Sequence, residues 1–334
     1  MKKNLLLIFL LFVSQVSMSS CSDEYETENQ HLIPTEDGSF TDSQFLNFEI
    51  SLYSDNSRGN QSAAIFGDYV FLVTDQLNTI HLYNIKNKRY LCKKTFEKKT
   101  DLTPGGYVLY HCNQMTCGVD YYAPDDPFPL LYISQRCRSD YRYFVEVYRI
   151  MPTKSDSDND YSAMDAQLVQ TIYFPQMSED NSLGNVNCVI DSNTRMMYTY
   201  SRNNDKSAEN YRKCKISCFD IPDFHDVETY LEDNDIKSSF MLGCSAVNMQ
   251  GGCVKDGKLF IGQGSKSAGY IYLNIVDLAE QKLLRRIDLL AQGITWEPEG
   301  CFAYNGNIMV CAGKNIWQFH FEEEEPGGNQ EQSD

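Results

Sequence analysis

Residues Met249–Ile261 read MQGGCVKDGKLFI, and this stretch is the best-preserved copy of an internal repeat. The amide side chain of Gln250 is followed by a small residue, Cys253, and then by the turn signal Asp256-Gly257 and an apolar run. An Asp-Gly pair between two β-rich runs is a strong signal for a tight hairpin turn. The stretch therefore predicts two adjacent antiparallel strands.

The same frame occurs at four other places in the chain. In the first copy, Gln61 stands at the position of Gln250, and Ala64 stands at the position of Cys253. Self-similarity at a long, regular spacing is the sequence signature of repeat folds built from small sheets. The other copies of the frame are Asn60–Leu72, Asn113–Cys117, Asn185–Cys188 and Glu297–Asn307.

Each copy is followed by a third strand-like run, and most units add a fourth. Short runs rich in β-branched and aromatic residues, separated by turn signals, predict strands. We therefore predict an all-β fold, a β-propeller of five blades. Six or seven blades stay open as alternatives if the long second and third units contain extra sheets. The third runs are Thr79–Ile85, Tyr143–Ile150, Cys214–Ile221, Tyr270–Leu278 and Asn315–Phe321, and the fourth runs are Arg89–Phe96, Leu168–Phe174 and Leu283–Leu289.

The last unit ends after its third run, at Phe321. An unpaired sheet edge is a site for aggregation, and closed folds remove such edges. The strand-like segment Phe45–Leu52 precedes the first unit and can supply the missing strand. We therefore expect an N-terminal strand to close the ring. Two polar stretches inside units two and three, Pro152–Asp165 and Arg202–Arg212, are predicted to be surface loops.

The N-terminus has the pattern of an export signal. Two lysines precede an apolar run, Leu5–Val13, and small residues then lead to Cys21. The segment MSSC resembles a bacterial lipobox, with Met18 in place of the usual leucine. We predict a signal peptide over 1–20, a lipidated Cys21, a flexible tether over 21–40, a β-propeller over 41–321 and an acidic disordered tail over 322–334.

The charge balance limits the partners. The formal net charge is −17, and loss of Lys2 and Lys3 with the signal peptide makes the mature chain −19. Binding to phosphate backbones needs a basic surface, so a nucleic-acid partner is disfavoured. Docking of the body onto anionic lipid is disfavoured for the same reason. The membrane is expected to be contacted through the lipid anchor alone.

The twelve cysteines do not point to a metal site or to redox chemistry. Cys117, Cys188, Cys253 and Cys301 share one repeat position, where the first unit has Ala64. A position that alternates between Cys and Ala favours a small apolar side chain, and free cysteine packs well in such places. We therefore interpret this position as a packing position and leave the disulfide connectivity open.

The candidate binding residues lie where the innermost strand of each blade begins. These starts converge on one mouth of a propeller channel. Amides with an acidic patch and an indole suit a sugar, because amides donate and accept while Trp offers an apolar face. They also suit a central Ca²⁺ cation with Glu299 as a ligand, or they merely satisfy strand ends. The predicted ligand-binding residues are Gln61, Gln114, Asn185, Gln250, Trp296, Glu297 and Glu299.

Catalysis is the less favoured interpretation. Glycoside hydrolysis needs two carboxyl groups that flank the scissile bond, and here only one blade start is acidic. We assign no catalytic residue. The leading hypothesis is binding of a glycan or another extracellular ligand. The alternatives are a metal-dependent hydrolase or lyase that uses Glu297 or Glu299 with a central cation, and a scaffold for another envelope protein.

The chain resembles Bacteroidetes outer-membrane lipoproteins built on TolB-like or related propellers. The acidic run Asp23–Glu26 after Ser22 is similar to the surface-export signals of those lipoproteins, which implies a lipid anchor in the outer membrane at the cell surface. The motifs Gln250-Gly251 and Glu297–Gly300 also look like parts of phage receptor-binding and teichoic-acid-associated propellers. That second resemblance implies a glycan-facing role.

Overall fold

A computed structural model describes residues 44–48, 60–74, 78–97, 100–103, 106–136, 143–155, 160–175, 186–202 and 212–320. The chain divides into two units, Met1–Gln30 and His31–Asp334, and every described residue belongs to the second. The predictions for the signal peptide, Cys21, the acidic tail and Asn185 lie outside the described residues. Within the described part of the chain, no helix is long and apolar enough to cross a membrane.

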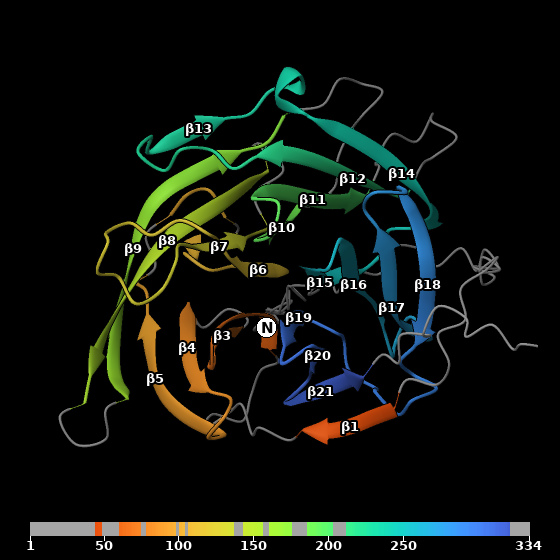
Figure 1. Cartoon of the computed structure of the whole chain (residues 1–334), viewed down its shortest axis with the longest axis horizontal. Helices are drawn as coiled ribbons and strands as arrows, with labels where there is room; N and C mark the ends of the chain where they lie inside the picture. The colour runs from red at the N-terminus through yellow and green to blue at the C-terminus, as the bar shows by residue number, and fades with distance from the viewer. Residues whose placement is uncertain are drawn as a thin grey trace, which may run out of the picture. The chain divides into compact units, whose positions relative to one another are not determined.

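Five sheets surround a common centre (Figure 1). We number them as blades 1 to 5 in the chain order of their innermost strands. Blade 1 contains β2 (Asn60–Phe66), β3 (Tyr69–Thr74), β4 (Thr79–Asn84) and β5 (Arg89–Thr95). Blade 2 contains β6 (Gln114–Cys117), β7 (Leu131–Ser134), β8 (Phe144–Lys154), β9 (Tyr161–Tyr173) and β13 (Glu228–Tyr230). Blade 3 contains β10 (Asn187–Asp191), β11 (Met196–Arg202), β12 (Lys213–Asp220) and β14 (Ser238–Ser245).

The remaining two blades complete the ring. Blade 4 contains β15 (Met249–Lys255), β16 (Lys258–Ser265), β17 (Tyr270–Asp277) and β18 (Lys282–Asp288). Blade 5 contains β19 (Gly300–Tyr304), β20 (Asn307–Ala312), β21 (Asn315–His320) and β1 (Gln44–Phe48). A short 3-10 turn, η3, covers Asp233–Asp235. The innermost strands β2, β6, β10, β15 and β19 contact one another in ring order.

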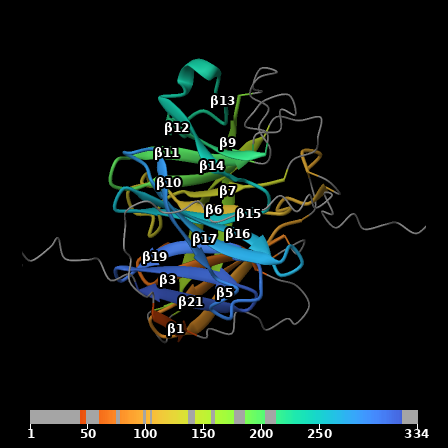
Figure 2. The same cartoon turned by 90° about the vertical axis from the view of Figure 1, so that its right-hand side faces the viewer.

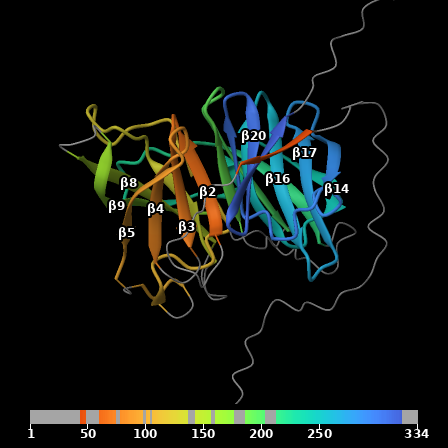
Figure 3. The same cartoon turned by 90° about the horizontal axis from the view of Figure 1, so that it is seen from below.

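The predicted all-β propeller is therefore confirmed, with five blades in the described residues and no sixth or seventh. Seen from the side, the strands of the blades run between the two faces of the ring (Figures 2 and 3). We call the face at which the innermost strands begin the start face. In an antiparallel blade the chain returns to this face after the second strand, so the turn between the second and third strands lies there as well.

The ring closes between the two ends of the folded chain. β1 pairs antiparallel with β21, in a register that runs from Gln44 opposite His320 to Phe48 opposite Ile316. The prediction that an N-terminal strand completes the last blade is confirmed. This pairing removes the open edge that β21 would otherwise present.

The turn that the repeat predicts is present in blade 4. Lys255 pairs with Lys258 across Asp256 and Gly257, which have φ angles of 51° and 71°. Two successive residues with positive φ make the turn whose twist matches a hairpin, and glycine takes this conformation without steric cost.

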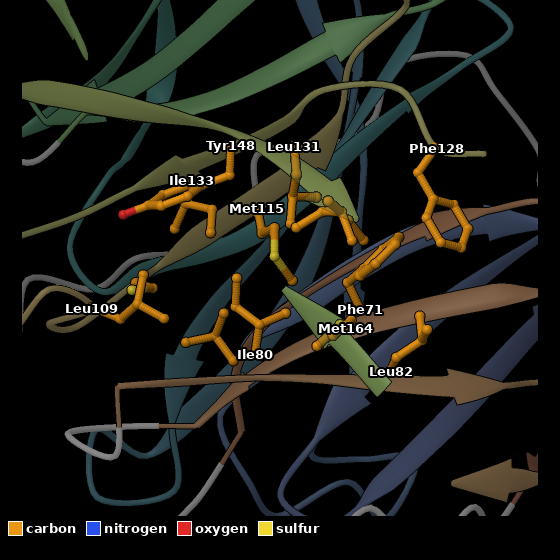
Figure 4. Packing of buried hydrophobic residues seen from close by; sticks show 14 of the residues in the cluster. Phe71, Ile80, Leu82, Leu109, Met115, Phe128, Leu131, Ile133, Tyr148 and Met164 are labelled. Atoms are coloured by element: carbon orange, nitrogen blue, oxygen red, sulfur yellow. The ribbon is translucent and has the colours of Figure 1, made fainter. Parts of the chain in front are cut away.

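Neighbouring blades pack face to face around the ring. One cluster of buried apolar side chains lies between each pair of neighbours, so every blade is apolar on both faces. Figure 4 shows the cluster between blades 1 and 2, in which Phe71 and Leu82 of blade 1 meet Leu131 and Met164 of blade 2. Burying each such side chain contributes roughly 1.5–3 kcal/mol.

The prediction of a surface loop over Pro152–Asp165 is wrong in part. β8 and β9 continue as a long hairpin that reaches blade 1, where β9 contacts β5. Tyr161 and Met164 join the apolar cluster shared with blade 1. Asp160 accepts a hydrogen bond from Arg89 Nη2 at 3.0 Å. The additional residues of unit two therefore extend a hairpin that packs against blade 1, and they do not form another sheet.

Blade 2 also encloses an acidic side chain. Glu146 on β8 is buried and accepts hydrogen bonds from Tyr148 Oη, at 2.6 Å, and from Gln135 Nε2. Burial raises the pKa of Glu146 to about 7, while the hydrogen bonds from Tyr148 and Gln135 act to lower it.

The burial of Glu146 predicts that the free energy of unfolding depends on pH. The unfolded chain releases the Glu146 proton near pH 4.5, whereas the folded protein keeps it until about pH 7, so the carboxyl lowers stability progressively as pH rises across that interval. Glu146→Gln removes the titration and keeps an acceptor for Tyr148. We expect the variant to exceed the wild type in free energy of unfolding by roughly 3 kcal/mol at pH 8 and to match it near pH 4. Urea unfolding at both pH values measures this, and an equal gain at both would contradict it.

Candidate ligand-binding cleft

Two blades begin with the same local irregularity. The pairing of β2 with β3 shifts between Asn60 and Ser62, and the pairing of β15 with β16 shifts between Met249 and Gly252. A bulge inserts one extra residue, bends the strand and re-aims the side chain at that point. Each shifted segment contains the glutamine that the repeat aligns, Gln61 in blade 1 and Gln250 in blade 4.

Both glutamines reach the segment that leads into blade 5. Gln61 Nε2 donates to Glu299 Oε1 at 3.3 Å, and Gln250 Nε2 donates to Glu297 Oε2 at 3.3 Å. Blade 5 lies between blades 4 and 1 in the ring. The acidic segment Glu297–Glu299 is therefore held by one amide from each neighbouring blade.

Glycines allow the backbone of this segment to pack closely. A Cβ atom on Gly251 would lie 2.4 Å from the carbonyl oxygen of Glu299, and one on Gly300 would lie 2.7 Å from the backbone nitrogen of Ala63. Neither position has room for a side chain. The Gln-Gly and Glu-Pro-Glu-Gly motifs of the sequence thus form one packed seam.

An open cleft of about 560 Å³ lies on the start face beside this seam. Trp296 is 65% exposed, and its indole lies against the backbone of Gly313 in the turn between β20 and β21. Ser265 ends β16 and Ser267 lies in the turn that follows, with their hydroxyl oxygens 2.9 Å apart. The lining residues are Asn60, Gln61, Ser265, Lys266, Ser267, Thr295, Trp296, Glu297, Glu299 and Gly313.

The cleft contains buried polar atoms that the described protein does not satisfy. Asn60 is only 2% exposed, and neither its Nδ2 nor its Oδ1 has a hydrogen-bond partner among the described residues. The carbonyl oxygen of Gln61, Oε1, is in the same situation. Buried polar side chains are normally paired, because an unpaired one costs about 1–3 kcal/mol. Asn60 and Gln61 are both among the residues that line the cleft.

The structure brings together most of the residues that the sequence singled out. Gln61, Trp296, Glu297 and Glu299 line the cleft, and Gln250 adjoins it through its hydrogen bond to Glu297.

Gln114 has a different place and does not line the cleft. Its side chain is fully buried, its Nε2 donates to the carbonyl oxygen of Gly252 at 2.8 Å, and its Oε1 accepts from the Gly252 N–H at 2.6 Å. Tyr200 Oη lies 3.2 Å from the same Oε1 and 2.5 Å from the carbonyl oxygen of Gln250. Gln114 thus bridges blades 2 and 4 across the centre of the ring. β6 shows no bulge in its pairing with β7, so the equivalent glutamine is aimed inward.

Several cleft residues were not predicted. Ser265, Lys266 and Ser267 lie at the end of a second strand, and Gly313 lies in the corresponding turn of blade 5. Antiparallel connectivity places these turns on the same face as the strand starts, and that rule is the signal that could have identified them.

The arrangement provides few ligands for a cation. Among the described residues, no three His, Cys, Asp or Glu side chains group as metal ligands. Gln61 and Gln250 present N–H donors to the two carboxylates, whereas Ca²⁺ requires oxygen ligands. Glu299 as a metal ligand stays a prediction.

The comparisons with known proteins do not assign a family. No protein family and no curated protein matches the sequence. Among solved structures, glutaminyl cyclase from Myxococcus xanthus is 8% identical, with a TM-score of 0.46, over 85% of this chain and 97% of that one. The PQQ-bound aldose sugar dehydrogenase from Streptomyces coelicolor is 11% identical, with a TM-score of 0.46, over 84% and 99%. Similarities this weak carry no information about the chemistry of the cleft.

Removal of the paired amide of Gln114 and of the unpaired amide of Asn60 is predicted to change the free energy of unfolding differently. Gln114→Met leaves the N–H and carbonyl groups of Gly252 buried without their partner, so we expect a loss of roughly 2–4 kcal/mol in the free energy of unfolding. Asn60→Ala removes an amide that has no partner in the described protein, so we expect a change of less than about 1 kcal/mol or a gain. Urea unfolding of both variants measures the difference. Equal losses would contradict the assignment of Gln114 to structure and Asn60 to the cleft.

Proposed function

We propose that this protein is a binding protein that captures a glycan in the cleft between blades 4, 5 and 1. The observation that carries the proposal is the exposed indole of Trp296 beside the buried, unsatisfied amide of Asn60. A sugar ring has an apolar face that can pack on an indole. Its hydroxyl groups both donate and accept, as the nitrogen and oxygen of an amide require.

The volume and the charge of the cleft fit the same ligand class. Small-molecule sites commonly enclose about 300–1,000 Å³, and this cleft of about 560 Å³ lies within that range. Glu299 is buried at the edge of the cleft, and the chain as a whole is strongly acidic, so a neutral glycan is favoured over an anionic one.

We propose binding rather than turnover. Glu297 and Glu299 lie on one segment and each accepts a hydrogen bond from a glutamine of a neighbouring blade. Glycoside hydrolysis uses two carboxyl groups that flank the scissile bond. Two carboxylates on one segment, each bonded to a glutamine of the protein, do not provide that arrangement.

We also propose a cellular location, which the N-terminal sequence supports. Acylation of Cys21 would tether the propeller to the outer membrane by a lipid anchor. We expect Cys21→Ser to abolish acylation, detected by mass spectrometry of the mature N-terminus, and to move the protein from the membrane fraction to the soluble fraction. A variant that stays acylated and membrane-bound would contradict the anchor.

Glycan binding is tested on a glycan array, followed by calorimetry with the strongest ligand. Trp296→Ala is expected to weaken binding by roughly tenfold or more, because the apolar platform is lost. Asn60→Ala is expected to weaken it as well. Tyr230→Ala is the matched control, because Tyr230 is an exposed aromatic residue on β13 that does not line the cleft.

The binding measurement also distinguishes direct glycan recognition from recognition through a bound Ca²⁺ ion. Binding that survives a chelator, with no response to added Ca²⁺, agrees with direct recognition by amides and indole. A glycan that binds Trp296→Ala and Tyr230→Ala equally well would contradict the proposed site.

A further inference from the structure

In blades 1 and 4, the bulge changes the face of the blade toward which the side chain at one repeat position points. Because side chains alternate between the faces of a strand, one extra residue turns every later side chain to the opposite face. Cys253, after the bulge in β15, packs in the cluster between blades 4 and 5 and therefore points toward the following blade. Cys188 of β10, which has no bulge in its pairing with β11, packs in the cluster between blades 2 and 3 and points toward the preceding blade.

This reversal corrects the interpretation of the cysteines as one uniform packing position. Cys301 of β19 also points toward its preceding blade, which is blade 4. A forward-pointing and a backward-pointing cysteine therefore meet at the seam between blades 4 and 5, with their Sγ atoms 3.4 Å apart. Between blades 1 and 2, the same two repeat positions hold Ala64 and Cys117, so these positions provide one thiol there; Cys92 and Cys112 lie elsewhere in that cluster.

We propose that Cys253 and Cys301 are a thiol pair that is oxidised, in the folded protein, to a disulfide joining the innermost strands of blades 4 and 5. A disulfide bond is about 2 Å long, so the two sulfur atoms need to approach by little more than 1 Å. The predicted export signal places the chain where disulfides form and persist.

The reaction has a defined order and balance. The oxidant is a small disulfide, or the active-site disulfide of a thiol–disulfide oxidoreductase. Cys253 is half-buried, whereas Cys301 is 2% exposed. Burial raises the pKa of the Cys301 thiol well above its usual value, so Cys253 is the first to attack. The Cys253 thiolate bonds to one sulfur of the oxidant and releases the other as a thiol. Cys301 then displaces the remaining oxidant sulfur, so that two protein thiols are oxidised and one disulfide is reduced to two thiols.

The bond would fix the seam that carries the cleft. Cys301 is on β19, two residues after Glu299, and Cys253 is on β15, three residues after Gln250. A covalent link between residues 48 positions apart restricts the unfolded chain, so oxidation is expected to raise the thermal midpoint by several degrees.

The test oxidises the reduced, folded full-length protein with oxidised glutathione and maps the products by mass spectrometry of a non-reducing digest. We expect one cross-linked peptide pair containing Cys253 and Cys301, lighter by two hydrogens than the two thiols. We also expect the thermal midpoint to rise and to return when reductant is added. Cys301→Ala should remove both effects. Cys253→Ser provides the same test if Cys301→Ala does not fold.

Cys117→Ala is the matched control, because it removes the thiol at the same repeat position in blade 2. The cross-link should form in this variant at the wild-type yield. The proposal is overturned if the Cys253–Cys301 peptide is absent after saturating oxidation, or if it forms only after denaturant is added.

Discussion

The pairing of β1 with β21 is the constraint on which the rest of the described fold depends. Five sheets whose two faces are both apolar must each be covered by two neighbours, and only a closed ring provides this for all of them. Closure also places blade 1 beside blade 5, although Gln61 and Glu299 are 238 residues apart in sequence. The cleft is built at this join, so the site exists because the ring closes.

Within the ring, some buried polar atoms are paired with one another and others have no partner in the described protein. Gln114, Tyr200 and the Gly252 backbone satisfy one another across the centre. Asn60 and the Oε1 atom of Gln61 are also buried, at the start face, but lack partners within the described protein. The glutamine at this repeat position is therefore bonded across the centre in blade 2. In blades 1 and 4, where a bulge is present, it is bonded to the Glu297–Glu299 segment.

Much of the architecture could be predicted from the sequence, because local signals determine it. The Asp256-Gly257 turn, the recurring β-rich runs and the N-terminal closing strand follow from hairpin and edge-strand physics. The orientation of single residues could not be predicted, because a one-residue bulge at Gln61 or Gln250 changes the face without changing the pattern. The β8–β9 hairpin was missed for a related reason. Its polar composition indicates a loop, and only its contacts with blade 1, such as Asp160 with Arg89, favour a strand.

Hydrogen exchange in the strands on either side of the join measures whether ring closure builds the cleft. Backbone amides of β21 and of β2 would be compared between the full chain and a chain that lacks residues 1–48. If closure builds the cleft, the truncated chain loses protection in β21 and at the start of β2, because the edge of blade 5 opens and its seam with blade 1 loosens. Unchanged protection of both strands in the truncated chain would contradict the account.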